Sequence, residues 1–410
     1  MNPGQALAAL AIGAATLAAI AVGEIPRLRM NRATIAVVGA TLLLVTGVRT
    51  LGEASAAVDA DTLVLLFGMM VLNANLRLAG FFEHSATRLV RAARTPRRLL
   101  AVTVALAGGL AAVLLNDTIA LGLTPLVLGM TKAAGLSPLP FLMALATAAN
   151  VGSSATIIGN PQNMIVGATS GIPFLRFAAF LAPQALAGCA AVWAVLAFVY
   201  RRELAPRTLG PDRAGPATVV DRRLLRKSLA ATALLLVMLA AGAPAPLSAL
   251  AAASALLVTR RTAPERVFAE IDWSLLVFFA GLFVVSDAID AALHARGLAD
   301  HVQAWVDSGT AGLAAVTVVL SNVVSNVPAV LLLRGPVARL ANPEHGYLVL
   351  AMASTLAGNL TLLGSVANLI VAELARRQEV ELSFAEYLKA GVPITLATLA
   401  IGIAWLSLVA

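Results

Sequence analysis

The stretch ANVGSSATIIGNPQN, residues 149–163, decides the fold. It lies in an apolar run, about 138–168, that exceeds the roughly 20 residues needed to cross a bilayer. Within it, Pro161 follows Gly159 and Asn160, and a proline removes a backbone donor and clashes with the preceding helical turn. Irregular backbone persists at membrane depth only inside protein or beside a watery cavity. The stretch therefore predicts a broken membrane helix beside a polar site.

Three other apolar runs are interrupted by polar residues. The interruptions read LNDT at 115–118, SNVVSNVP at 321–328 and GNLTLLGSVAN at 358–368. The last lies in the run 347–375 and predicts a second broken helix. The other two lie in runs 99–131 and 309–340, which are too long for one helix and carry a proline near the middle. For each of these we predict a re-entrant hairpin whose polar tip enters the membrane.

The composition agrees with a membrane location. Of 410 residues, 60% are hydrophobic and 12% are charged, whereas a soluble domain has roughly 45–50% and about 25%. So few charges cannot coat a soluble multidomain protein, and a disordered or fibrous chain is equally excluded. We predict an all-α integral membrane protein. Further spans are expected at 5–22, 33–49, 62–80, 181–200, 226–241, 245–259, 272–290 and 391–409.

The chain contains an internal repeat. Asn116-Asp117-Thr118 matches Ser325-Asn326-Val327, and the segment from Thr156 to Asn163 matches that from Thr361 to Asn368, with offsets of 205 to 213 residues along the two halves. We predict a first repeat at 1–202, a linker at 203–225 and a second repeat at 226–410. About five spans per repeat is an odd number, so the second repeat is inverted, an arrangement typical of secondary transporters.

Basic residues predict the orientation. They cluster near 27–32, 88–98, 201–227, 260–266 and 376–377, whereas the loop 50–61 is acidic. Positive charge favours the cytoplasmic side. The linker is therefore expected in the cytoplasm and both termini on the outer, periplasmic side.

The four interruptions supply the candidate binding residues. The N-terminal end of a half-helix offers N–H donors and a positive dipole to an anion, and freed carbonyls with hydroxyl and amide oxygens suit Na⁺. Polar side chains also join membrane helices, but their density and recurrence favour a site. The predicted residues are Asn116, Asp117, Thr118, Asn150, Ser153, Ser154, Thr156, Gly159, Asn160, Asn163, Ser321, Asn322, Ser325, Asn326, Asn359, Thr361, Gly364, Ser365 and Asn368.

Asp117 is the one acidic residue at the centre of an interrupted run, and its counterpart is Asn326. An intramembrane carboxylate is a functional candidate by default, although it could also cap a half-helix. We predict that it carries a proton or helps to hold Na⁺, with the sodium site near Asn116, Asp117, Ser325 and Asn326.

Other functions lack their motifs. There is no G-x-x-x-x-G-K-[ST] phosphate loop, no histidine in a predicted span and no acidic mate for Asp117, so neither an ATP motor nor an intramembrane hydrolase is expected. The four histidines form no metal-ligand pair, and the basic residues follow the membrane rather than a nucleic acid. We expect no enzyme activity and no cofactor beyond a coupling ion, H⁺ or Na⁺.

The paired tips and paired broken helices resemble the ion transporter superfamily of divalent-anion symporters, citrate transporters, arsenite permeases and sodium/proton antiporters. The tip Asn116-Asp117 is more similar to the arsenite-permease and antiporter branch, and the motifs around Gly159, Ser325 and Gly364 resemble bacterial inner-membrane anion permeases. Val327 stands where the symporters carry threonine. The resemblance implies a multi-pass protein of the bacterial cytoplasmic membrane.

We therefore expect a secondary active transporter that moves a small inorganic or carboxylate anion by alternating access. The alternatives are a cation/proton antiporter and an efflux permease for neutral oxyacids such as arsenite or silicic acid; a passive channel is less favoured. The predicted partners are the anion, the lipid bilayer and a second copy in a homodimer, with no nucleic acid.

Overall fold

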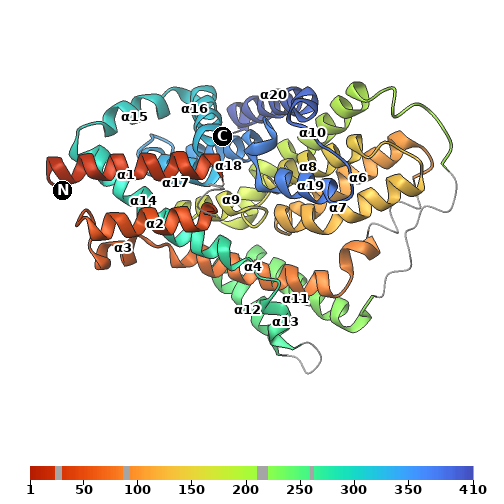
Figure 1. Ribbon diagram of the computed structural model, residues 1–410, viewed down its shortest axis with the longest axis horizontal. Coiled ribbons are helices and arrows are strands. Elements are labelled where there is room, and N and C mark those ends of the chain that lie inside the picture. The colour runs from red at the N-terminus through yellow and green to blue at the C-terminus, as the bar shows by residue number, and fades with distance from the viewer. Residues whose placement is uncertain (24–29, 86–92, 210–219, 259–262, 410) are drawn as a thin grey trace.

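The computed structural model describes residues 1–410 except 24–29, 86–92, 210–219, 259–262 and 410. Within this part the chain is helical and contains no strand (Figure 1), which confirms the predicted all-α class. The middle of the predicted linker, 210–219, and parts of four basic segments lie outside the described residues.

The two halves carry the same order of helices. The first contains α1 (Pro3–Val22), α2 (Arg32–Val45), α3 (Leu51–Ala57), α4 (Ala60–Leu78), α6 (Pro96–Ala111), α7 (Asn116–Ala133), α8 (Leu139–Ser153), α9 (Pro161–Ser170) and α10 (Phe174–Val199). The second contains α11 (Arg222–Ala240), α12 (Ala245–Leu257), α13 (Pro264–Phe268), α14 (Trp273–Ala295), α15 (Ala299–Val306), α16 (Gly309–Val324), α17 (Asn326–Ala338), α18 (Pro343–Ala357), the short η1 (Leu362–Gly364), α19 (Val366–Arg376) and α20 (Phe384–Val409).

Packing between the halves is reciprocal. Helix α4 of the first half packs against α12 of the second, and α14 of the second packs against α2 of the first. Helix α10 packs against its counterpart α20, and α9 and α19 each contact the central helix of the other half, α18 and α8. In Figure 1, α4, α11, α12 and α13 lie in the lower part of the molecule, and α9, α18 and α19 lie near the centre. This reciprocity is the packing expected of two related repeats.

Small residues allow the helices of the two halves to pack closely where α4 crosses α12 and where α14 crosses α2. A Cβ atom added to Gly68 on α4 would lie 2.7 Å from the backbone carbon of Ala249 on α12. At the equivalent crossing, a Cβ atom on Gly281 of α14 would lie 2.8 Å from the backbone carbon of Ala36 on α2. Close backbone approach over small residues is a common way for membrane helices to associate. These two crossings hold α2, α4, α12 and α14 in one assembly, which we call the scaffold.

Burial distinguishes central from peripheral helices. Every residue from Pro140 to Ser153 of α8 and from Gly346 to Ala357 of α18 is buried. The long helices α10 and α20 instead leave large apolar side chains on the surface, such as Leu186 and Leu408, which are 73% and 83% exposed. Lipid accepts such side chains, whereas water does not. The polar motifs are therefore carried by the most enclosed part of the molecule.

The helices break where the sequence predicts. Helix α8 ends at Ser153 and α9 begins at Pro161, with Asn160 as its N-cap; α18 ends at Ala357 and α19 begins after the N-cap Ser365. The run 99–131 forms α6 and α7 with a turn before Asn116, and the run 309–340 forms α16 and α17, separated at Ser325. The predicted fold, with paired hairpins and paired broken helices, is confirmed.

Several helices differ in length from the predicted spans. Among the described residues, α1, α4, α10, α14 and α20 are each long and apolar enough to cross a bilayer alone. The runs 33–49 and 245–259 form the shorter α2 and α12, of 14 and 13 residues. Helix α2 stops because Gly47 turns the chain with φ +69°. Helix α15 was not expected, and it meets α16 at a 120° bend.

Candidate functional site

A cavity of about 1130 Å³ reaches both hairpin tips and parts of both broken helices. Its polar inner wall consists of Asn116, Asp117, Gln162, Ser325, Asn326 and Ser365. Charged residues from the start of α2, the start of α14 and the end of α19 also line it, among them Arg32, Asp272 and Arg376. Both halves of the chain thus contribute to one cavity.

The first tip is firmly held. The backbone N–H of Asn116 donates to the Gly159 carbonyl at 3.0 Å, and its side-chain amide donates to Asn150 Oδ1 at 3.0 Å. Thr118 Oγ1 accepts a hydrogen bond from Asn73 Nδ2 of α4 at 3.2 Å. Asp117 lies in the first turn of α7, where the helix dipole stabilises a negative charge. The tip therefore presents a carboxylate from a fixed backbone.

The second tip is strained and less restrained. Ser325 has φ 82° and ψ 158°, a conformation adopted almost only by glycine. The neighbouring Asn326 is buried, and its Oδ1 has no hydrogen-bond partner among the described residues. Asn116 Oδ1 of the first tip is likewise buried without a partner in that part of the chain. Each tip therefore contains a buried hydrogen-bond acceptor without a partner, on a residue that lines the cavity.

Two equivalent asparagines hold the breaks together. Asn163 Nδ2 donates to the carbonyls of Ser153 at 3.2 Å and Thr156 at 2.9 Å. Asn368 Nδ2 donates to the carbonyls of Gly358 at 2.8 Å and Thr361 at 3.2 Å. Carbonyls freed by a helix break must be satisfied in the membrane. These two side chains perform that task at matching positions of the two repeats.

Hydrogen bonds across the halves are also reciprocal. Asn150 donates to Asn368 Oδ1 at 3.1 Å and accepts from Ser365 Oγ at 3.0 Å. At the matching positions, Thr355 donates to Asn163 Oδ1 at 3.2 Å and accepts from Asn160 Nδ2 at 3.2 Å. The three matched pairs are 150 with 355, 160 with 365 and 163 with 368, all at a single offset. The repeat is therefore visible in individual hydrogen bonds.

The predicted residues fall into two groups. Those lining the cavity are Asn116, Asp117, Ser325, Asn326, Gly364 and Ser365. The others do not line it: Thr118, Asn150, Ser153, Ser154, Thr156, Gly159, Asn160, Asn163, Ser321, Asn322, Asn359, Thr361 and Asn368. Several of these form a supporting shell; for example, Thr156 Oγ1 donates to the Ala112 carbonyl at 2.6 Å and Asn359 Nδ2 to the Thr147 carbonyl at 3.1 Å.

Some residues at the site were not predicted. Thr355 could have been found as the repeat counterpart of Asn150. Gln162 lies within the predicted motif and lines the cavity, and Asn73 is a buried amide in the middle of a span. Arg32 and Asp272 reach the cavity because the starts of α2 and α14 meet there. The contacts of Arg32 and Asp272 depend on tertiary packing and leave no local sequence signal.

The four residues of the predicted sodium site share the cavity. Asn116, Asp117, Ser325 and Asn326 offer a carboxylate, two amide oxygens and a hydroxyl, which is an all-oxygen donor set suited to a hard cation. The Oδ1 atoms of the two asparagines are buried and have no hydrogen-bond partner among the described residues. The chemistry of the donor set therefore fits a hard cation.

Comparison with known proteins agrees with this architecture. A family profile described as citrate transporter matches residues 15–357. The silicon efflux transporter LSI3 of Oryza sativa subsp. japonica is 32% identical over 93% of both chains, and an uncharacterized transporter of Mycobacterium bovis is 28% identical over 92% of this chain and 94% of its own. The YdaH transporter of Alcanivorax borkumensis has a similar fold, with a TM-score of 0.58, 16% identity and coverage of 85% and 84%. The chain belongs to the citrate transporter family of multi-pass membrane transporters.

Proposed function

We propose that this chain is a secondary active transporter for a small oxyacid, moved as the neutral acid or as its anion, and coupled to H⁺ or Na⁺. The protonated form fits the cavity better. Three residues of the polar wall carry the acceptors that support this: the Asp117 carboxylate and the unpartnered, buried Oδ1 atoms of Asn116 and Asn326. Unused acceptors favour a substrate that donates hydrogen bonds through hydroxyl groups, and Arg32 and Arg376 on the same cavity can accompany its anionic form.

The acceptors on the cavity wall support the neutral-oxyacid alternative that the sequence left open. Silicic and arsenious acid carry several hydroxyl groups on a small centre. The relative in Oryza sativa is named for silicon efflux, which supports the same class of substrate. A cation/proton antiporter remains the second candidate, because the same three acceptors could hold a cation.

Asp117 is proposed to bind the coupling ion. Asp117 is half-buried and lies in the first turn of α7. The dipole of that helix stabilises the charged form of its carboxylate. With Asn116, Ser325 and Asn326 it would hold Na⁺, or alone it would exchange a proton. Asp117→Asn keeps the shape and removes the charge. We expect it to abolish ion-coupled uptake in proteoliposomes while the protein stays folded.

Alternating access would follow from relative movement of two assemblies. The hairpins and broken helices carry the site, and the scaffold of α2, α4, α12 and α14 is held by the Gly68 and Gly281 crossings. We place the protein in the bacterial cytoplasmic membrane, with the linker in the cytoplasm and both termini in the periplasm, as a homodimer. The charge distribution supports this orientation.

A thermal-shift panel on the purified protein tests the substrate class. The ligands are silicic acid, arsenite, sulfate, phosphate, succinate and citrate, each with Na⁺ or Li⁺, because a ligand that binds the folded state stabilises it. We expect silicic acid or arsenite to raise the melting temperature, and Asp117→Asn to remove any difference between the two ions. Stabilisation by sulfate, phosphate or the carboxylates alone would contradict the neutral-acid proposal. A response to Na⁺ or Li⁺ with none to any oxyacid would favour the antiporter.

A further inference from the structure

Asn150 lies at the junction of three polar motifs and is itself buried, with 2% of its surface exposed. Its Nδ2 donates to Asn359 Oδ1 at 2.9 Å and to Asn368 Oδ1 at 3.1 Å. Its Oδ1 accepts from Asn116 Nδ2 and from Ser365 Oγ, both at 3.0 Å. An asparagine side chain has two donor hydrogens and two acceptor lone pairs. All four are used within the protein.

A saturated side chain away from the cavity wall has no capacity left for a ligand. Asn150 therefore acts through others: it joins Asn116, which precedes Asp117 on the first tip, to Ser365 and Asn368 of the second broken helix. Buried networks of this kind are rigid because breaking one bond leaves an unpaired polar group at low dielectric. These hydrogen bonds fix the position of the first tip relative to the second break.

The connection continues to the second tip. Asn368 Nδ2 donates to the Gly358 carbonyl at 2.8 Å, and a Cβ atom on Gly358 would lie 3.1 Å from Asn326 Nδ2. The Asn326 amide therefore lies close to the second break at Gly358. The chain of contacts begins at Asn116, next to Asp117, and continues through Asn150 and Asn368 to Gly358 and the nearby Asn326. It therefore connects one repeat to the other.

The matching position in the other repeat does not provide this link. Thr355 has one hydroxyl, which donates to Asn163 and accepts from Asn160 and from Gln162 Nε2 at 3.5 Å. It forms no hydrogen bond with Ser325 or Asn326 within the described part of the chain, and Asn326 Oδ1 has no partner there. Among the described residues, a hairpin tip is therefore hydrogen-bonded to the central asparagine in the first repeat, and the matching bond is absent in the second.

We propose that Asn150 is a positioning residue that transmits occupancy of the ion-binding tip at Asp117 to the second hairpin tip at Ser325 and Asn326. The inference rests on the proposed role of Asp117 and deepens it. It assigns the coupling between ion and substrate to one side chain in the first repeat. Thr355, its counterpart, positions the first break alone.

The test measures communication between the tips without a transported substrate. Val327→Cys places a thiol on the cavity wall beside Asn326, in a Cys189→Ala background, and its reaction with N-ethylmaleimide is followed in proteoliposomes. Na⁺ is compared with choline at constant pH, and low pH with high pH at constant Na⁺. Allosteric couplings are commonly about fivefold or more. We expect the effective ion to change the labelling rate by about that factor.

Three variants identify the residues on which the ion effect depends. Asp117→Asn should abolish the ion effect, because it removes the ion-binding group. Asn150→Thr should abolish it as well, since the shorter side chain cannot replace all four hydrogen bonds; threonine is the residue at the counterpart position. Thr355→Ser, which keeps a hydroxyl at the counterpart position, should retain the full ion effect.

The outcomes separate this inference from the proposed function. If Asp117→Asn leaves the ion effect intact, Asp117 is not the coupling site and the proposed function fails. If Asp117→Asn abolishes the effect but folded Asn150→Thr retains it, only the positioning role of Asn150 is overturned. If the starting protein shows no ion effect in either arm, no communication between the tips exists and the inference is overturned. Should Asn150→Thr not fold, Asn150→Asp, which keeps the acceptors and loses both donors, replaces it with the same expected loss.

Discussion

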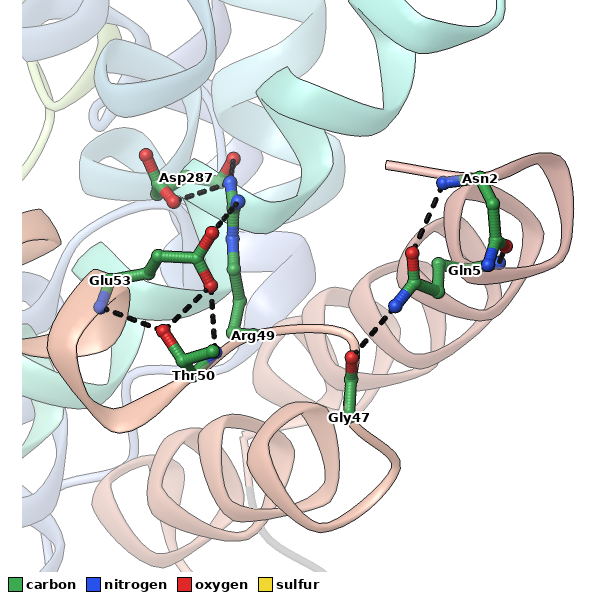
Figure 2. A network of polar contacts seen from close by, with 7 residues as sticks. All are labelled: Asn2, Gln5, Gly47, Arg49, Thr50, Glu53 and Asp287. Carbon is green, nitrogen blue, oxygen red and sulfur yellow. Dashed lines mark hydrogen bonds and ion pairs between the residues drawn. The ribbon is translucent and has the colours of Figure 1, made fainter.

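Arg49 and Asp287 join the two repeats just beyond the end of α2. Arg49, just beyond α2, lies 2.5 Å from the Asp287 carboxylate of α14 and donates to the Asp287 carbonyl at 2.8 Å (Figure 2). Glu53 lies 3.8 Å from the same guanidinium, and Gln5 Nε2 of α1 donates to the Gly47 carbonyl nearby at 3.0 Å. The cavity that Asp117 lines lies elsewhere, at the beginnings of α2 and α14. The α2–α14 pair is therefore fastened at the end away from the cavity.

We predict that Arg49→Ala lowers the stability of the protein. It removes two contacts with α14 that bridge the repeats. Because the Asp287 side chain is 39% exposed, solvent screening limits the loss to about 1 kcal/mol. Thermal unfolding in detergent measures it. Arg376→Ala is the matched control: Arg376 is 75% exposed, pairs among the described residues with Glu373 of its own helix, and should change stability by less than about 0.5 kcal/mol. Equal melting temperatures for the two variants would contradict the bridging role.

Gly68 is predicted to be intolerant of a methyl group. Gly68→Ala would place a Cβ atom 2.7 Å from the Ala249 backbone, which cannot move aside as a flexible side chain could. Overpacking of this kind costs about 1–3 kcal/mol. The control is Gly129→Ala, where the added Cβ meets no atom within 4 Å and alanine favours the helix. Thermal unfolding should show a lower melting temperature for the first and an unchanged or higher one for the second. A tolerant Gly68 would mean that the two helices are not so closely packed.

Ser325 is predicted to store strain at the second tip. Its backbone conformation, φ 82° and ψ 158°, suits glycine, so Ser325→Gly should raise stability by about 1 kcal/mol after the entropy of the added glycine is counted. Ser325→Ala removes the same hydroxyl but retains the strain, and should give no such gain. Comparing melting temperatures of these two variants isolates the backbone effect. A gain of equal size from alanine would place the effect in the hydroxyl instead.

Much of this architecture could be read from local sequence. Proline at 161 and glycine at 159 and 364 disrupt helices through their own backbone chemistry, so the breaks are visible without any tertiary information. The repeat was visible in the same way, because Asn163 and Asn368 occupy equivalent places in their motifs. The helix breaks and the repeat together predicted the class of fold and the location of the polar motifs.

The roles of individual polar residues could not be read in this way. Asn116 and Asn150 are both asparagines in apolar runs, yet Asn116 retains a free acceptor at the cavity and Asn150 uses all of its capacity inside the protein. That difference depends on which atoms of the other repeat lie opposite. Helix α15, which meets α16 at a bend of 120°, was not predicted either.

The orientation of the chain gives the last prediction. Ser55 on α3 lies in the acidic loop and is exposed, and Ala205 begins the basic linker and is also exposed. Because basic segments remain in the cytoplasm, Ser55→Cys should react with a membrane-impermeant maleimide in intact cells, and Ala205→Cys only after the membrane is opened. Both variants are made in a Cys189→Ala background, which by itself serves as the unlabelled control. Labelling of both positions in intact cells would contradict the predicted topology, whereas labelling of Ala205→Cys alone would invert it.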